Sequence, residues 1–259
     1  MSRPSYFISD LHVRANDDER TQAVLRFLRA RQGEAEAVYL VGDVFDFWLG
    51  YRHALFSAQF SLLRALAELV EAGTRVVLFS GNHDPDPGPL PASLGIEVHH
   101  GPLVAPIQGR TVRLEHGDVV DPRGWHRRAV CRFARHPWTR AAARWVHPDR
   151  AWQLGRLYGG DHAPSEYGAP LPQALFDTYL PGRAAEGVDV LVMGHYHRAV
   201  VHSARIGDRP VQFFVLGDWV AQRTWLKADQ GEFTLWRDQG PDRAPTRIPP
   251  GDHGPERAA

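Results

Sequence analysis

The chain has 259 residues and 43% hydrophobic content, which is enough for one sizeable core with a small appendage. Thirty basic and thirty acidic residues give a net charge of zero, so charge gives no reason to expect a nucleic-acid partner. A single cysteine excludes a disulfide framework and a cysteine-based zinc cluster. Because the sequence shows no signal peptide and no run of about 18 apolar residues, we expect a cytoplasmic protein.

The first third of the chain alternates between strand and helix patterns. Short apolar runs indicate buried strands, and apolar residues at helical spacing indicate helices that cover a sheet. Gly73 is expected to end the second helix. The predicted elements are a strand at 6–9, a helix capped by Asp17 or Asp18, a strand at 38–41, a helix at 53–71 with Leu55 on its inner face, and a strand at 76–79.

The later part of the chain is richer in strands, which favours a second, mixed sheet. The fold class is therefore predicted to be α/β with mixed sheets, in one domain at 1–237 that carries a helical insertion at about 121–166. Residues 238–259 are rich in Pro, Gly and charge, so we expect a disordered tail. The later predicted strands are 96–98, 103–104, 111–115, 188–193, 211–216 and 233–236.

Polar motifs follow several of the predicted strands. Ligand sites in sheets of this kind lie beyond the carboxyl ends of the strands, so the motifs are predicted to meet in one place. In Asp10-x-His12 and His195-x-His197, the two-residue spacing would put both side chains on the same face of a strand. Asp10-x-His12 alone, or Asn82 alone, is more often a turn, but together the motifs predict a metal site. The candidate ligands are Asp10, His12, Asp43, Asn82, His116, His195 and His197.

These residue types narrow the choice of metal. Carboxylate, amide and imidazole donors together suit Mn²⁺, Fe or Zn²⁺ better than an all-oxygen calcium site. Asp43 follows the apolar run at 38–41, and we expect its carboxylate to bridge two divalent ions.

The motifs resemble the signature of the calcineurin-like metallophosphoesterase family, from Asp10 to His197. The resemblance implies a four-layer αββα sandwich. It implies a first metal held by Asp10, His12, Asp43 and His197, and a second held by Asp43, Asn82, His116 and His195. It also implies that a metal-activated hydroxide attacks phosphorus. His83 would contact the phosphate or protonate the leaving group, and Asp84 would orient His83.

The insertion at 121–166 is rich in Arg and aromatic residues. We interpret it as a helical lid whose helices are interrupted at Pro137 and Pro148. Arg binds phosphate, and a basic aromatic helix can lie on an anionic membrane surface. A solvated basic face with inward-packed aromatics and a site for single-stranded nucleic acid stay open as alternatives. The candidate substrate-binding residues are Asp118, Arg123, Trp125, Arg127, Arg128 and Arg132.

Several stretches between Tyr6 and Trp219 are similar to the branch of this family that hydrolyses UDP-2,3-diacylglucosamine in lipid A biosynthesis. That similarity implies cleavage of the pyrophosphate to 2,3-diacylglucosamine 1-phosphate (lipid X) and UMP, with Mn²⁺ as the metal. It also implies attachment to the cytoplasmic face of the inner membrane. The sequence departs from the best-known members, which carry Arg at the position of His83. Action on another nucleotide, phosphodiester or phospholipid is the alternative, and a non-catalytic scaffold is a remote one.

Overall fold

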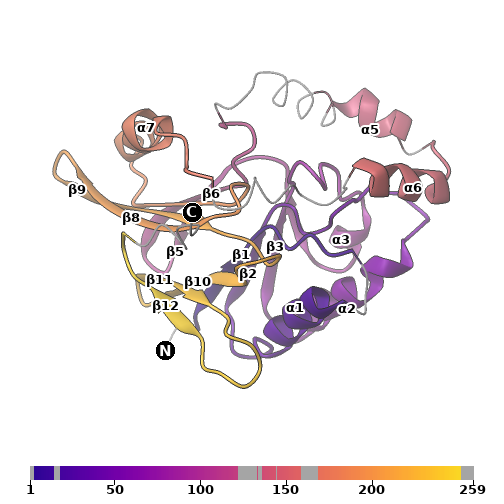
Figure 1. The fold of residues 1–259 in the computed structure, drawn as a ribbon, viewed down its shortest axis with the longest axis horizontal. Helices are drawn as coiled ribbons and strands as arrows, with labels where there is room; N and C mark the ends of the chain where they lie inside the picture. The colour runs from indigo at the N-terminus through magenta and orange to yellow at the C-terminus, as the bar shows by residue number, and fades with distance from the viewer. Residues whose placement is uncertain are drawn as a thin grey trace, which may run out of the picture.

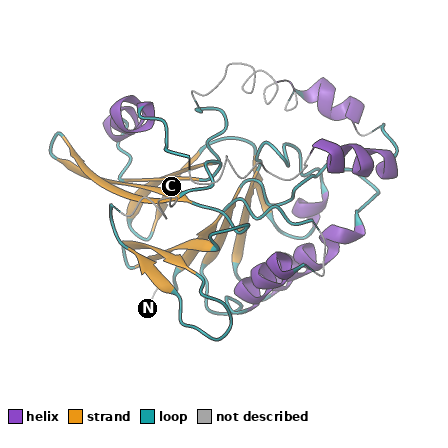
Figure 2. Cartoon of the chain, viewed as in Figure 1, coloured by secondary structure: helices purple, strands orange, loops and turns teal. Residues whose placement is uncertain are grey.

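The computed structural model describes residues 3–14, 18–121, 133, 136–143, 145–158 and 169–251, with the backbone alone at 137, 140 and 154–158. Two mixed β-sheets pack face to face, and helices cover the outer face of each sheet (Figures 1 and 2). The predicted four-layer αββα sandwich is therefore confirmed.

The first sheet has seven strands in the order β12-β11-β10-β1-β2-β3-β4. The strands β1 to β4 run parallel, whereas β10, β11 and β12 each pair antiparallel with a neighbour. Because these four strands run in the same direction, their carboxyl ends share one edge of the sheet. The bounds are β1 Ser5–Ile8, β2 Ala37–Val41, β3 Arg75–Phe79, β4 Glu97–His99, β10 Thr224–Asp229, β11 Glu232–Arg237 and β12 Thr246–Ile248.

The second sheet has five strands in the order β5-β6-β7-β9-β8. Its central strands β6, β7 and β9 are parallel, and antiparallel partners flank them on both sides. The bounds are β5 Leu103–Ile107, β6 Arg110–Glu115, β7 Val190–Met193, β8 Ala199–Ile206 and β9 Arg209–Leu216.

Helices on both outer faces complete the layers. Helices α1 and α2 pack against the first sheet through a cluster that includes Val24 and Leu66, and α7 covers the second sheet near Met193. Asp18 caps α1 by accepting a hydrogen bond from the Thr21 backbone N–H, as the sequence predicts. The bounds are α1 Glu19–Arg29, a 3₁₀ turn η1 Ser57–Gln59, α2 Phe60–Glu71, α3 Leu90–Ser93, a π-helical turn η2 Leu175–Tyr179 and α7 Leu180–Ala185.

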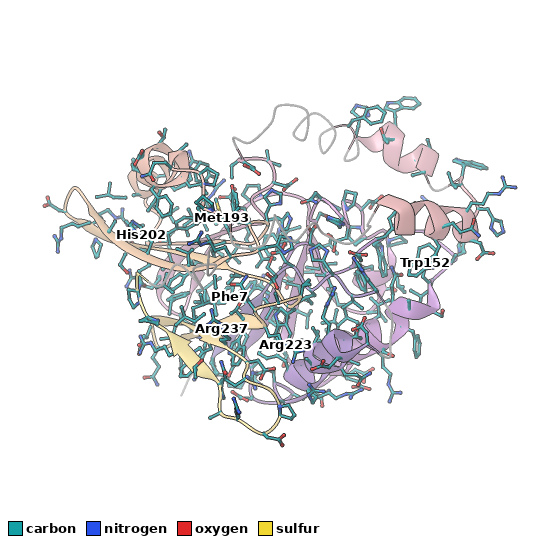
Figure 3. The ribbon with its side chains drawn as sticks, in the orientation of Figure 1. Phe7, Trp152, Met193, His202, Arg223 and Arg237 are labelled. Atoms are coloured by element: carbon teal, nitrogen blue, oxygen red, sulfur yellow. The ribbon has the colours of Figure 1, made fainter. Side chains whose placement is uncertain are left out.

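The core between the sheets is apolar and aromatic. Phe7 lies near the middle of the molecule (Figure 3), where its ring stacks on Tyr39 with centroids 4.8 Å apart. Val41 and Phe79 continue this layer on the first sheet, and Phe214 faces them from the second. Burying these side chains fixes how the two sheets face each other, and therefore which strand ends meet.

Several sequence predictions need correction. The second helix begins at Phe60 and not at residue 53, and Leu55 is 41% exposed because it lies before the helix. Residues 238–251 are not disordered, because β12 pairs with β11 and buries Ile248. Strands β8 and β10 and the segment from η2 to α7 were not predicted. Residues 252–259 lie outside the described residues.

The described part of the insertion contains two helices, α5 (Pro137–Ala143) and α6 (Pro148–Tyr158), which lie together at one end of the molecule (Figure 1). Both begin at a proline, which is tolerated in the first helical turn. Trp152 lies on the side of α6 that faces the domain (Figure 3), with its ring 5.0 Å from that of Phe56. Tyr51 Oη donates a hydrogen bond to the Val146 carbonyl at 2.7 Å. The insertion is thus attached to the loop before α2.

We predict that Ile248→Ala destabilises the domain by about 2–4 kcal/mol, because the side chain is 4% exposed in the inter-sheet core. Arg247→Ala, in the same strand, removes only an exposed ion pair with Glu232 and should cost less than about 1 kcal/mol. Urea unfolding of both variants measures the difference. Equal midpoints would mean that β12 contributes nothing to the fold.

Candidate metal centre

The structure brings all seven predicted ligands to one edge of the sandwich. The parallel strands of the two sheets end there, so side chains far apart in the chain become neighbours. Asp10 and His12 follow β1, Asp43 follows β2, Asn82 follows β3, His116 follows β6, and His195 and His197 follow β7.

Asp10, His12 and His197 form the first group. Asp10 Oδ1 lies 3.9 Å from His12 Nε2 and 3.6 Å from His197 Nε2. All three side chains are buried. Asp10 Oδ1 has no hydrogen-bond partner among the described residues. A buried carboxylate oxygen is costly when it is unsatisfied, so these atoms fit a bound cation.

Asn82, His116 and His195 form the second group. Asn82 Oδ1 lies 3.1 Å from His116 Nε2 and 3.0 Å from His195 Nδ1. Two ligands at about 2.1 Å from one ion and at right angles to each other are about 3 Å apart, so this spacing suits a single divalent ion. The donor set of one amide oxygen and two imidazoles suits a transition metal.

Asp43 lies between the two groups. Its Oδ2 is 3.9 Å from His12 Nε2 in the first group and 3.3 Å from His116 Nε2 in the second. Its Oδ1 accepts the His83 backbone N–H at 2.9 Å, which fixes the rotation of the carboxylate. One oxygen therefore faces both groups, which is one of the ways in which a carboxylate can bridge two metal ions.

The backbone at this edge is unusual. Five of the seven candidate ligands have a positive φ, between 45° and 70°: Asp10, His12, Asp43, His195 and His197. Asp10 and His12 thus come together through left-handed turns after β1 ends, and not because they share one face of a strand. Such a conformation costs about 1–3 kcal/mol per residue and is typical of functional sites.

Two glycines allow the ligand loops to approach each other. A Cβ at Gly81 would lie 2.0 Å from Asp43 Oδ1 and 2.4 Å from Asp43 N. A Cβ at Gly42, where φ is +83°, would lie 2.4 Å from His116 Nδ1. Both distances are shorter than real contacts, so a side chain at either position would push a candidate ligand out of place.

The buried charges perturb one another strongly. Burial raises the pKa of Asp10 to about 8, and the nearby Asp43 carboxylate adds to the rise. Burial works to raise the pKa of Asp43 as well, but His116, His83 and His12 hold it well below its usual value. Burial alone would lower the pKa of His116, and Asp43 instead raises it to about 10. Protons and metal ions therefore compete for the same atoms.

Each candidate histidine has a polar group near its outer ring nitrogen. His116 Nδ1 bonds to the Val41 carbonyl at 2.9 Å, which requires the proton on Nδ1. His12 Nδ1 lies 3.4 Å from Asp46, His195 Nε2 lies 3.2 Å from Asp121, and His197 Nδ1 lies 3.8 Å from Asp218. Hydrogen-bonded partners such as the Val41 carbonyl and Asp121 orient metal-binding imidazoles. Sequence reasoning missed these three carboxylates, although Asp46 stands out between two Phe residues.

His83 and Asp84 do not pair. His83 Nδ1 bonds to the Asp46 carbonyl at 3.0 Å. Asp84 is buried, and its carboxylate accepts hydrogen bonds from the backbone N–H groups of Gly81, Asp43, Val44 and Phe45. The predicted role of Asp84 in orienting His83 is therefore wrong. Four backbone donors outcompete a single imidazole, and Asp84 clamps the two ligand loops together.

The structure describes only one of the predicted substrate-binding residues. Asp118 is 4% exposed and lies two residues after His116. The others lie outside the described residues: Arg123, Trp125, Arg127, Arg128 and Arg132.

The family model of the calcineurin-like phosphoesterases matches residues 4–199, a span that contains every candidate ligand. The chain belongs to the calcineurin-like phosphoesterase family. A UDP-2,3-diacylglucosamine hydrolase from Pseudomonas syringae pv. syringae (strain B728a) is 34% identical over 231 residues, which covers 88% of this chain and 93% of that protein. A protein of the same name from Stenotrophomonas maltophilia (strain K279a) is 31% identical over 242 residues, which covers 88% of this chain and 96% of that protein.

The solved structures that match the fold are less similar in sequence than these relatives. A phosphodiesterase described as novel and archaeal superposes with a TM-score of 0.48 at 13% identity, covering 90% of this chain and 99% of that one.

As a calcineurin-like phosphoesterase, the protein is a metal-dependent hydrolase. The buried cluster of Asp and His side chains fits divalent ions, because carboxylate oxygens and imidazole nitrogens converge in groups whose ligand atoms lie within 4.8 Å of one another.

We predict that affinity for Mn²⁺ rises with pH between 6 and 8. Before metal is added, His116 and Asp10 hold protons at neutral pH, since their pKa values are about 10 and 8. A metal must displace these protons, so affinity gains roughly tenfold per pH unit for each proton released. Calorimetry in buffers of different ionisation enthalpy measures both the Mn²⁺ affinity and the number of protons released. Affinity that is constant over this range, without proton release, would contradict the assignment.

Proposed function

We propose that this phosphoesterase hydrolyses the pyrophosphate bond of UDP-2,3-diacylglucosamine, giving 2,3-diacylglucosamine 1-phosphate and UMP. The observation that carries the proposal is 34% identity, over 88% of the chain, to a relative named UDP-2,3-diacylglucosamine hydrolase. The convergence of the candidate ligands supports it independently, because a pyrophosphate carries oxygens that two cations can hold.

We assign one ion to Asp10, His12 and His197 and the other to Asn82, His116 and His195, with Asp43 shared by both. Bound divalent ions neutralise phosphate charge and make hydroxide available near neutral pH by lowering the pKa of water. We favour Mn²⁺, since the mixed carboxylate, amide and imidazole set suits it. The protein holds these donors in place through the turns and backbone clamps at the strand ends.

His83 is the proposed catalytic residue. One of its ring nitrogens lies within 4.8 Å of a His12 nitrogen and an Asp43 carboxylate oxygen, so the ring borders the proposed metal positions. The Asp46 carbonyl can only accept, so Nδ1 donates the proton in that bond. The other nitrogen is then the one to meet a substrate phosphate or to protonate the leaving oxygen.

A second candidate function follows from His83 itself. The best-known enzymes of the proposed specificity carry Arg there, which binds phosphate as a bidentate cation. An imidazole is smaller and can transfer a proton. Hydrolysis of another nucleotide, phosphodiester or phospholipid is therefore the alternative reaction of the same site.

The insertion is the proposed membrane-facing and substrate-covering segment. Trp138 is 80% exposed and Trp145 is 91% exposed, and Phe133 in the same insertion is 70% exposed. Large exposed aromatics are costly in water and favourable at a membrane interface. Among the described residues, no helix has the length and apolar character that crossing a bilayer requires. On the basis of the exposed aromatic residues, we propose peripheral binding at the cytoplasmic face of the inner membrane.

We predict that the purified protein with Mn²⁺ converts UDP-2,3-diacylglucosamine to UMP and a lipid monophosphate, identified by mass spectrometry. Asp43→Ala should lose at least about 10³-fold in rate, because both proposed ions lose a ligand. Hydrolysis of an aryl phosphodiester without hydrolysis of the lipid substrate would favour the alternative reaction. Unchanged turnover by Asp43→Ala would overturn the proposed site.

We predict that the double variant Trp138→Ala, Trp145→Ala loses about tenfold or more in binding to anionic liposomes, measured by co-sedimentation. Phe60→Ala is the matched control, because Phe60 is 55% exposed but lies outside the insertion. The control should bind like the unmodified protein. Equal binding by all three proteins would contradict the proposed membrane surface.

A further inference from the structure

The insertion begins at a residue that contacts a candidate ligand of the proposed second metal. Asp121 is the first residue of the insertion and is only 3% exposed. Its Oδ2 lies 3.2 Å from His195 Nε2. An acidic side chain at the start of an insertion is ordinarily solvated, so its burial against a candidate ligand calls for an explanation.

The chemistry of this contact selects one form of His195. A carboxylate only accepts hydrogen bonds and is a stronger acceptor than an amide carbonyl. A neutral His195 therefore places its proton on Nε2, toward Asp121. Its Nδ1 keeps the lone pair and lies 3.0 Å from Asn82 Oδ1, on the side of the second group. A metal ligand needs that lone pair.

A tight turn fixes where Asp121 stands. The backbone N–H groups of Val120 and Asp121 both donate to the Gly117 carbonyl, at 3.2 and 3.1 Å. Gly117 has a φ of +112°, and a Cβ there would lie 3.3 Å from the Tyr196 ring and 3.5 Å from His195 Cβ. The turn therefore packs directly on the segment that carries His195. The Gly194 backbone N–H also donates to the His116 carbonyl at 3.0 Å, joining the two segments.

We propose that Asp121 is a positioning residue that holds His195 in the form protonated on Nε2, and so presents Nδ1 to the second metal. The proposal rests on the proposed assignment of His195 as a ligand. It goes further, because it makes the first residue of the insertion part of the support of the metal centre. The point at which the insertion leaves the sandwich is then fixed relative to that ion.

The test compares Asp121→Ala and Asp121→Asn with Asp149→Ala. Asp149 is an exposed acidic residue of the same insertion and serves as the control. Nitrogen-15 NMR of the imidazoles reads which ring nitrogen carries the proton before metal is added. Calorimetry with Mn²⁺ then reads the affinity of each site without reference to turnover.

In the unmodified protein we expect the His195 proton on Nε2. Asp121→Ala should give a mixture of both protonated forms and weaken the second Mn²⁺ by about 10–100-fold, with the first Mn²⁺ unchanged. Asp121→Asn keeps an acceptor oxygen and nearly the same shape, so it should retain most of the affinity. Asp149→Ala should behave like the unmodified protein.

Two results would overturn the proposal. One is a His195 proton on Nδ1 in the unmodified protein, which needs no variant and so does not depend on whether a variant folds. The other is an Asp121→Ala variant that binds the second Mn²⁺ with full affinity. Failure of the proposed function is distinguishable, because a protein that binds two Mn²⁺ in this way but leaves UDP-2,3-diacylglucosamine intact would disprove only the substrate.

Discussion

A buried carboxylate shared between two sets of imidazoles is the interaction on which the site depends. Asp43 Oδ2 faces His12 on one side and His116 on the other, and both sheets must be in place for this to happen. His12 comes from the first sheet and His116 from the second. The apolar layer around Phe7 and Phe214 sets the distance between the sheets, so packing of the core determines the geometry of the charged edge.

The protein holds this edge at an energetic cost. Five candidate ligands adopt left-handed backbone conformations, which Asp and His tolerate better than most residues do. Asp84 offsets part of that cost by accepting four backbone N–H groups from the two neighbouring loops. Gly81 lets those loops come close enough to share it. The strain is therefore maintained by the surrounding hydrogen bonds, as is common where a site must be preorganised.

Sequence predicted the layers and the set of converging side chains, because apolar runs that end in Gly-Asp or Gly-His mark strand ends directly. It did not predict the outer partners of the histidines, because contacts such as Asp121 with His195 join residues 74 positions apart. Because Asp84 follows His83 in the sequence, it was predicted to orient that histidine. Its carboxylate instead accepts backbone N–H groups of the loop after β2, which the sequence does not show to be close. Strand β12 was missed because one buried Ile248 in a polar segment gives almost no periodic signal.

The most direct test is anomalous diffraction from crystals grown with Mn²⁺, because it locates the ions without any assay. We expect two peaks about 3.5–4 Å apart on either side of Asp43 Oδ2, one beside Asp10, His12 and His197 and the other beside Asn82, His116 and His195. A single peak, or peaks away from this edge, would contradict a dinuclear centre bridged by Asp43.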